Sequence, residues 1–274
     1  MQSDTPLVSV IISAYNSAAW IKQTLDSLLT QTYTQWEALV IDDASTDGTL
    51  SILNEYAYTD KRFKVYKRTE NTGYVKNLNF LIPQCEGVYI ARLDADDVCT
   101  PNRLALQVAY MQKYKVNMVT GYIDVVNEKN VKIGEWNADR NNYTPVQIRN
   151  TMPWHNCIAH PTVMIQANIL KANTYNEAQT SSEDWHLWLQ LLAYKYTIGK
   201  VPEVVLYYRK LTTSVTAKSL QQSAYTKNHN TYTIYLKQVS ACKQWNRYNY
   251  IVLVAYYFNY CKMILSNLKK RILS

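Results

Sequence analysis

The sequence predicts an α/β protein with a largely parallel sheet, helices on both of its faces and a helical C-terminal region. Short apolar, β-branched runs alternate with segments of helical periodicity up to residue 123. Polar clusters directly follow three of these runs, which is where sheets of this kind bind ligands. From about residue 218 onward the pattern is helical only.

The first strand is expected at residues 7–13 (LVSVIIS), because a continuous apolar run is typical of a strand buried on both faces. Asn16 or Ser17 then caps a helix with apolar residues at helical spacing. A second buried strand is expected at residues 38–41. It leads into the polar sequence DDASTDGT and a helix from about Thr49.

A third strand is expected at residues 63–66, followed by a turn at residues 71–73 and a helix through Leu81. Residues 88–93 form the fourth strand, which ends in the acidic sequence DADD. Pro101 suits the first turn of the next helix, and a further strand follows at residues 118–123.

After residue 127 the periodicity is weaker. We expect a helix at residues 180–193, two short strands at 197–201 and 204–208, and helices from 218. The predicted organisation is a globular domain over residues 1–217 and a basic, Tyr-rich helical region over residues 218–274.

Charge is distributed unevenly along the chain, whose net charge is +8. From Val204 to Ser274 there are eleven basic residues and no Asp or Glu, whereas 18 basic and 21 acidic residues lie before that segment. This asymmetry predicts an anionic partner for the C-terminal region, either a membrane or a nucleic acid.

The last helix is expected to be amphipathic. Five polar residues recur every three or four positions and are surrounded by apolar side chains. These polar residues are Asn259, Lys262, Ser266, Lys269 and Lys270. A broad apolar face with basic residues suits the interface of an anionic bilayer, and it equally suits packing on the rest of the protein.

Compartment is indicated by the cysteines and the N-terminus. The five cysteines contain no CxxC pair, and because their number is odd one of them could not form a disulfide within the chain. This favours a reducing, cytoplasmic location. MQSDTPLVSV lacks the pattern of a signal peptide, and the longest apolar stretch, residues 251–258, is far shorter than the roughly 20 residues that span a bilayer. We therefore expect a protein that does not cross a membrane.

Asp94 and Asp96 follow a buried strand at positions i and i+2. Carboxylate oxygens are hard ligands that suit Mg²⁺ or Mn²⁺. Such a pair also occurs on solvated loops, but its place after a buried strand favours the metal site.

Tyr15 and Asp43 follow the first two strands and have two interpretations. Tyr15 can stack on a nucleotide base while a carboxylate accepts a base N–H. Alternatively, the tyrosine is a partly buried aromatic and the aspartate ends a strand and starts a turn. The residues alone leave both open.

Glu183 and Asp184 lie at a predicted helix N-terminus, where carboxylates are favoured by the unpaired N–H groups. One of them can equally serve as a general base. His155 and His160 flank Cys157, but this spacing matches no standard zinc pattern, so we expect a structural or acceptor-side role for His160.

The sequence also contains no GxGxxG, GxxxxGK[ST], GxSxG or HExxH motif. Dehydrogenase, P-loop and hydrolase functions therefore lack their main support.

With these residues in place, the chain resembles the family 2 inverting glycosyltransferases of the GT-A fold, from about Val8 to Ser214. The resemblance departs from the family at Ser13, where a proline is usual. The matching segments, specific in their order and spacing, are VSVIISAYN, SLLTQTYTQWEALVIDDASTDGT, ENTGYVKNLN, YIARLDADDVCTP, HPTVMI, EDWHLWLQL and VVLYYRKLTTSVT.

On the donor side, the resemblance implies a GT-A Rossmann-like fold in which Tyr15 and Asp43 hold the base, usually uracil. Ala14 and Asn16 would border the base pocket. Lys76 falls where the family often has a basic residue near the donor.

The resemblance further implies that Asp96 binds Mn²⁺ or Mg²⁺, that Asp94 reaches the ribose or the metal shell, and that Ala95 lies between them in the donor site. Asp184 matches the catalytic base. The acceptor side and the closing flap would involve Glu183, His160 and Arg209, the last within the late YR motif.

The implied reaction is inverting transfer of a sugar from a nucleotide-diphosphate donor, usually a UDP-sugar, to a hydroxyl of a saccharide or lipid-linked saccharide. We expect it in bacterial surface polysaccharide synthesis, at the inner face of the cell membrane, with no nucleic-acid partner. Two alternatives are a lipid-phosphate sugar donor and a nucleic-acid-binding protein that uses the basic, Tyr-rich region.

Overall fold

The computed structural model describes residues 5–179, 181–211 and 224–273. The predicted boundary after residue 217 and the last residues of the resemblance, 212–214, lie outside these ranges. The strands of the described chain are β1 (Val8–Ala14), β2 (Trp36–Asp42), β3 (Phe63–Lys67), β4 (Tyr89–Arg92), β5 (Val98–Cys99), β6 (Met118–Val126), β7 (Lys132–Glu135), β8 (Met164–Gln166) and β9 (Ile198–Arg209).

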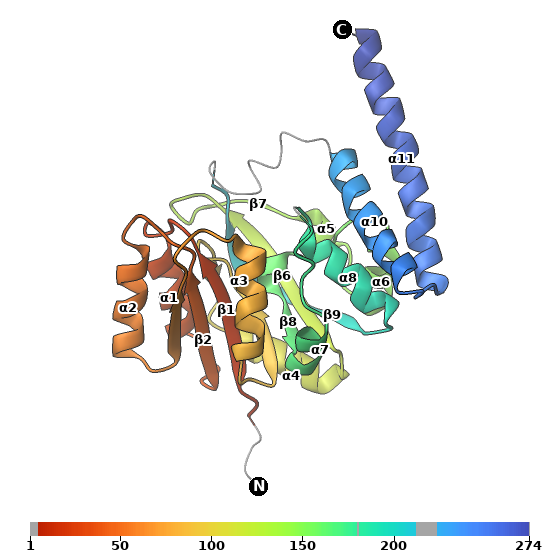
Figure 1. Cartoon of the computed structure of the whole chain (residues 1–274). Helices are drawn as coiled ribbons and strands as arrows, with labels where there is room; N and C mark the ends of the chain where they lie inside the picture. The colour runs from red at the N-terminus through yellow and green to blue at the C-terminus, as the bar shows by residue number, and fades with distance from the viewer. Residues whose placement is uncertain (1–4, 180, 212–223, 274) are drawn as a thin grey trace.

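Helices alternate with these strands and then end the chain (Figure 1). The α-helices are α1 (Ile21–Leu29), α2 (Thr49–Thr59), α3 (Tyr74–Leu81), α4 (Arg103–Tyr114), α5 (Asn137–Arg140), α6 (Pro145–Thr151), α7 (Ala167–Ala172), α8 (Glu183–Ala193), α10 (Ala224–Ala241) and α11 (Arg247–Leu273). Two 3₁₀ turns, η1 (Ile82–Gln84) and η2 (His160–Thr162), complete the set.

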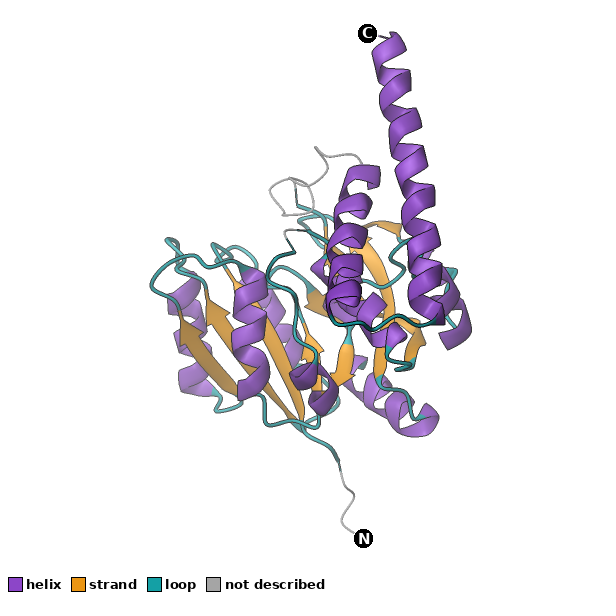
Figure 2. Cartoon of the chain, turned by 45° about the vertical axis from the view of Figure 1, so that its right-hand side comes forward, coloured by secondary structure: helices purple, strands orange, loops and turns teal. Residues whose placement is uncertain are grey.

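The described strands form one sheet in the order β3-β2-β1-β4-β8-β6-β9-β5, with β7 paired to β6. Strands β3, β2, β1 and β4 run parallel, and β6 runs parallel to β9. Strand β8 joins the two groups in antiparallel pairing. The predicted α/β fold is confirmed, and helices cover both faces of the strands (Figure 2).

Two cores lie on opposite faces of this sheet, as alternation along β1 shows. Ile11 packs with α3, α8 and the C-terminal helices, whereas Val10 and Ile12 pack with α1 and α4. Because side chains alternate across a strand, an uninterrupted apolar run buries both sets. The central strands are buried along almost their whole length, as the sequence predicts.

Strand β9 differs from the two strands expected at residues 197–208. Val201 pairs with Gly121 and Val204 pairs with Tyr122, so Pro202 and Glu203 bulge out between them. A proline lacks the N–H that a ladder needs, and a bulge accommodates it within one continuous strand. Three further strands, β5, β7 and β8, were not expected, because runs of two to four residues carry no clear period.

Helix α8 begins at Glu183, three residues later than the predicted start at residue 180. Its acidic first turn follows Ser182, which adopts a left-handed conformation with φ 56°. Both predicted acids therefore lie in the first turn, next to the unpaired N–H groups.

The C-terminal helices complete one of the cores. Tyr232 and Tyr235 of α10 and Val252 of α11 are buried in the same cluster as Trp185 and Trp188 of α8. Packing on the rest of the protein, one of the two alternatives for this region, therefore holds for α10 and the first half of α11. The domain boundary itself stays a prediction.

The amphipathic stripe expected in the last helix is oriented differently from the prediction. Asn259, one of its polar members, is buried and donates a hydrogen bond to the carbonyl of Tyr225 on α10. The apolar side chains of Val254, Tyr257 and Leu265 are exposed instead. The first residue of the polar stripe thus contacts α10. The side chains of Lys269 and Lys270 are not among those that the structure describes.

Candidate functional site

The site is built where the parallel strands end. Tyr15 follows β1 and is 49% exposed, so its ring is free to stack on a ligand. Asn16 adopts a left-handed conformation with φ 48°. Its N–H donates to Ser45 Oγ at 2.9 Å, and its Oδ1 accepts from the N–H of Thr46 at 2.8 Å. The loops after β1 and β2 therefore form one surface.

Asp43 is buried and fixes a distant turn. Its Oδ1 accepts from the N–H of Thr72 at 2.9 Å and its Oδ2 from the N–H of Gly73 at 2.9 Å. These bonds hold the chain at the start of α3, where Lys76 is exposed in the first turn. The N–H of Asp43 donates to the carbonyl of buried Ala14. Asp43 thus shapes the proposed base pocket by ordering its neighbours.

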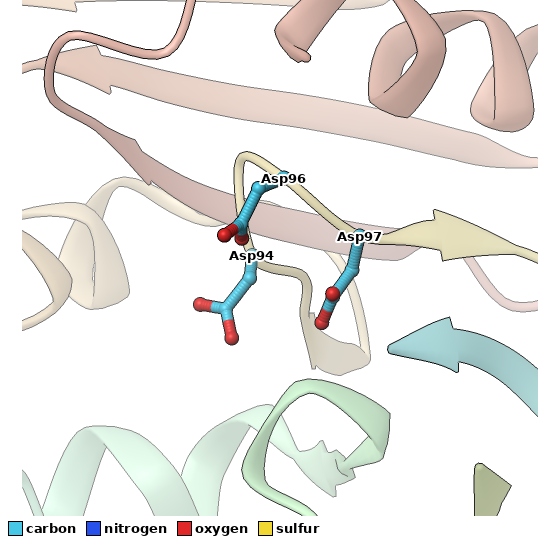
Figure 3. Close-up of side chains that lie close together, drawn as sticks. All are labelled: Asp94, Asp96 and Asp97. Carbon is cyan, nitrogen blue, oxygen red and sulfur yellow. The ribbon is translucent and has the colours of Figure 1, made fainter. Parts of the chain in front are cut away.

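Three carboxylates gather after β4 (Figure 3). Oxygens of Asp94, Asp96 and Asp97 lie within 4.8 Å of one another, and no other cluster of potential metal ligands occurs among the described residues. The loop is fixed by the carbonyl of Ala95, which accepts from Thr24 Oγ1 at 3.0 Å. Clustered hard oxygen donors fit Mg²⁺ or Mn²⁺. Asp97, adjacent to the predicted pair, was not singled out from the sequence.

Electrostatics distinguish these carboxylates. Arg92 on β4 forms a two-pronged ion pair with Asp94, with one Nη1–Oδ2 distance of 2.9 Å. Burial and then the charge of Asp94 raise the pKa of Asp96 to about 6. Burial likewise raises the pKa of Asp97 well above its ordinary range. A divalent cation would relieve this accumulation of negative charge. The cluster therefore favours a cation site, in which Asp94 is paired with Arg92 while Asp96 and Asp97 have no arginine ion pair among the described residues.

Arg209, at the end of β9, lies underneath the acidic loop. Its Nε donates to the carbonyl of Asp96 at 2.8 Å, and its backbone N–H donates to Asp97 Oδ1 at 2.8 Å. Its Nη groups donate to the Glu128 carbonyl and to Gln23 Oε1. The side chain is almost fully buried, so it positions the loop from behind, directly before the segment in which the flap is expected.

Replacing Arg209 should therefore destabilise the fold. We expect Arg209→Met to cost about 3–5 kcal/mol of unfolding free energy, because the buried carboxylates lose a cation and three acceptors lose their donor. Urea denaturation measures this change. The exposed Lys61→Met serves as the matched control and should leave the unfolding midpoint unchanged. An equal midpoint for both variants would show that Arg209 does not hold the loop.

The two acids at the start of α8, Glu183 and Asp184, have different surroundings, and Glu183 lies near a histidine. Its Oε1 lies 3.5 Å from His160 Nδ1, and His160 Nε2 lies 2.8 Å from the Tyr175 hydroxyl. Although burial alone would raise the pKa of Glu183, His160 and the Tyr74 hydroxyl lower it to about 2. Glu183 is thus a buried, ionised carboxylate held by partners on two other segments.

Asp184 differs from its neighbour. Its Oδ2 accepts from Asn156 Nδ2 at 2.7 Å. Burial raises the pKa of Asp184 more than nearby His160 lowers it, and the charge of Glu183 adds to the rise. A carboxylate with raised proton affinity and one side-chain hydrogen-bond partner suits proton abstraction better than one held in an ion pair.

Tyr175 links the acidic cluster to the acid pair. It is buried, and burial raises the pKa of its hydroxyl. The charged groups that act on this hydroxyl come from both sites: Arg92, Glu183, Asp184 and Asp94. The fold therefore brings together side chains that are about 90 positions apart in sequence.

Besides Asp97, two residues of this site, Arg92 and Asn156, were not singled out from the sequence. Arg92 lies two positions before Asp94, so strand alternation places both on one side, and this signal was available. Asn156 carries no such signal, because its contact with Asp184 depends on how the loop before η2 packs.

Comparison with known proteins shows the family to which the chain belongs. Residues 9–171 match the model of "Glycosyl transferase family 2". The O-antigen biosynthesis glycosyltransferase WbnJ of Escherichia coli is 31% identical over 222 residues, covering 80% of this chain and 83% of the relative. TuaG of Bacillus subtilis, a putative teichuronic acid biosynthesis glycosyltransferase, is 30% identical over 213 residues, covering 77% and 82%.

Solved structures share the fold. TarS residues 1–349 of S. aureus, in complex with UDP-GlcNAc, matches with a TM-score of 0.66 at 22% identity, covering 82% of this chain and 65% of that one. This chain thus spans just under two thirds of the TarS fragment. The mannosyltransferase PcManGT of Pyrobaculum calidifontis, in complex with GDP-Man and Mn²⁺, matches with a TM-score of 0.61 at 19% identity, covering 92% and 69%. The chain belongs to glycosyl transferase family 2.

Proposed function

We propose that this glycosyltransferase moves a sugar from a nucleotide-diphosphate donor, a UDP-sugar, to an acceptor hydroxyl with inversion at the anomeric carbon. The observation that supports the proposal is that a cluster of three carboxylates and the buried pair Glu183 and Asp184 both lie close enough to Tyr175 to act on its hydroxyl. Such an arrangement serves a reaction in which a diphosphate departs from one side while a hydroxyl is deprotonated on the other.

The donor side rests on Asp94 and Asp96. These carboxylates would hold Mn²⁺ or Mg²⁺, which supplies positive charge to the departing diphosphate. Arg92 keeps Asp94 oriented, and Arg209 holds the backbone of Asp96 in place. PcManGT, a structural neighbour, has been solved with Mn²⁺, which supports a divalent cation in this chain as well.

The acceptor side rests on Asp184. Its carboxylate takes the proton of the acceptor hydroxyl, whose oxygen then bonds the anomeric carbon as the bond to the diphosphate breaks. Asn156 fixes the orientation of this carboxylate. The electron pair leaves with the diphosphate, so no covalent intermediate with the protein forms.

For the acceptor, we propose a saccharide or lipid-linked saccharide of a bacterial surface polysaccharide, glycosylated at the inner face of the cell membrane. Relatives support this class. WbnJ is named for O-antigen biosynthesis, and WfgD of Escherichia coli, 31% identical over 190 residues, is named as a glucosyltransferase acting on GlcNAc-diphosphoundecaprenol.

One experiment tests the reaction class. The protein is incubated with a panel of nucleotide sugars, Mn²⁺ and candidate acceptors, and the released nucleoside diphosphate is measured. Release from a UDP-sugar that depends on both acceptor and Mn²⁺ is the expected result. Sugar transfer from a lipid-phosphate sugar, with no response to any nucleotide sugar, would instead identify the alternative donor.

The exposed ring of Tyr15 leads to a prediction about the donor base. If it stacks on the base, Tyr15→Ala should weaken donor binding by about 1–3 kcal/mol, the range for base–aromatic stacking. Calorimetry with UDP and Mn²⁺ measures this loss. Tyr15→Phe keeps the ring and should bind normally. Equal affinity of wild type and Tyr15→Ala would remove Tyr15 from the base pocket.

A further inference from the structure

The outward side of α11 is apolar, and its side chains stay largely exposed in the described chain. Its exposed side chains recur at helical spacing and share one side of the helix. We call this surface the outward face; it comprises Tyr250, Val254, Tyr257, Phe258, Ile264 and Leu265, each between 40% and 62% exposed.

The opposite side of α11 is already used. Tyr248, Val252, Ala255 and Asn259 are buried, at spacings of three and four residues. Because the helix packs on the protein through that buried side, the outward face is a second surface that the fold itself does not use for packing of the core. Figure 1 shows α11 extending well past the body of the protein, beside α10 only along its first part. A helix of 27 residues is about 40 Å long at 1.5 Å per residue.

Basic and aromatic side chains border the outward face. Trp245, 37% exposed, lies with its ring centroid 5.2 Å from that of Tyr250. Lys262 places its Nζ 4.4 Å from the ring centroid of Phe258, and Arg247 is exposed at the start of the helix. Aromatic rings and cations around an aliphatic centre are typical of a helix that lies at a membrane interface.

Charge identifies the occupant. The segment from Val204 to Ser274 has eleven basic residues and no acid, so a second copy of α11 would bring like charges together. A nucleic acid would match the charge but not the aliphatic Val254, Ile264 and Leu265. An anionic lipid bilayer matches both. None of the described helices has the length and apolar character to cross a bilayer.

The outward face continues onto the acceptor side of the site. Trp154, 42% exposed, packs edge-to-face against Phe258 with ring centroids 6.0 Å apart. Two residues further along this loop, Asn156 holds Asp184. The carbonyl of Pro153 accepts from the Tyr232 hydroxyl of α10 at 2.7 Å. The surface that would touch lipid is thus joined by a short loop to the base that deprotonates the acceptor.

We propose that the outward face of α11 docks the enzyme on an anionic bilayer, with the acceptor side of Asp184 next to the membrane. This inference rests on the proposed function only for the identity of the acceptor, which is then a lipid-linked saccharide. The docking itself depends on the exposed apolar and basic side chains alone.

Vesicle sedimentation of the full chain tests the docking. We expect binding to vesicles of phosphatidylglycerol and phosphatidylcholine at low salt, and little binding to phosphatidylcholine alone. The double variant Val254→Glu/Tyr257→Glu should lower the partition coefficient at least tenfold. Both side chains are more than half exposed, so the variant should fold. Tyr58→Glu, an exposed tyrosine on α2, is the matched control and should bind as wild type.

Three results would overturn the docking surface. They are failure of wild type to bind anionic vesicles, equal binding by the double variant, and loss in that variant of a dimer or of oligonucleotide binding without any vesicle binding. Calorimetry with UDP and Mn²⁺ on the same samples separates this test from the proposed function. Absent donor binding in every sample contradicts the reaction, whatever the vesicles show.

Discussion

Asp184→Asn should bind donor and cation normally while transfer falls by at least about 10²-fold, the contribution typical of a general base. The substitution keeps the shape of the side chain and an oxygen that can accept from Asn156 Nδ2. It removes the group that takes the proton. Single-turnover transfer and calorimetry with UDP and Mn²⁺, measured on the same preparation, separate chemistry from binding.

The pH dependence of wild-type transfer gives a second measurement of the same group. Since burial raises the pKa of Asp184, the ionised base is lost as pH falls through a value above the ordinary 3.8. The rate should therefore decline with acid at a higher pH than an exposed aspartate would produce. If proton removal by Asp184 limits the rate of transfer, the Asp184→Asn variant should not show this decline at acid pH.

Glu183→Gln is the matched control, since it alters the adjacent residue in the same turn of α8. Adjacent residues on a helix point about 100° apart, so the two carboxylates cannot exchange tasks. Glu183 is held by His160 and Tyr74, and its loss should appear mainly as reduced stability or weaker acceptor binding. Near-normal turnover in Asp184→Asn with an inactive but folded Glu183→Gln would reverse the assignment.

Asp96→Asn should abolish the effect of Mn²⁺ on donor binding and lower turnover by at least about 10²-fold, as losing one electrostatic stabiliser of a transition state does. Asparagine retains the size of the side chain but not its charge, and Asp96, unlike Asp94, is not paired with Arg92. Titration with Mn²⁺, followed by calorimetry in the presence of UDP, measures the loss.

Two further variants serve as comparisons for Asp96→Asn. Glu55→Gln removes an exposed acid on α2 and should leave Mn²⁺ dependence unchanged. Asp97→Asn removes a charge from the same cluster, while its oxygen can still accept from the N–H of Arg209. If Asp96→Asn keeps full affinity for UDP in Mn²⁺ and only Asp97→Asn loses it, then Asp97 is the principal ligand.

Much of the fold could be predicted because its central strands are unambiguous. Strands β1 and β2 are mostly apolar and are buried almost throughout, since helices cover both faces, and each is followed by polar residues at one sheet edge. The acidic cluster and the acid pair could be predicted for the same reason. Charge directly after a buried run, or at the start of an apolar helix, is conspicuous.

The remaining features depend on contacts between distant segments. Nothing near Asp43 in sequence shows that its carboxylate accepts from Thr72 and Gly73, nor that Asn156 would meet Asp184. The side of α11 that packs inward could not be predicted either. Its polar Asn259 pairs with a backbone carbonyl of α10, and only tertiary structure supplies that partner.

The packing of α10 and α11 against α8 has a consequence for synthesis of the protein on the ribosome. Trp185, the residue after Asp184 on α8, packs edge-to-face on Tyr232 of α10, and the same core extends to Ala255 of α11. Since a nascent chain emerges from its N-terminus, strands β1 to β4 can pair early, whereas Arg209, which holds the acidic loop, is made only after α8. The core around α8 cannot be completed until the chain has been translated past residue 255. The apolar side of α8 would therefore remain partly uncovered through most of synthesis, and a chain cut short before α10 would leave Trp185 and Trp188 without their packing partners.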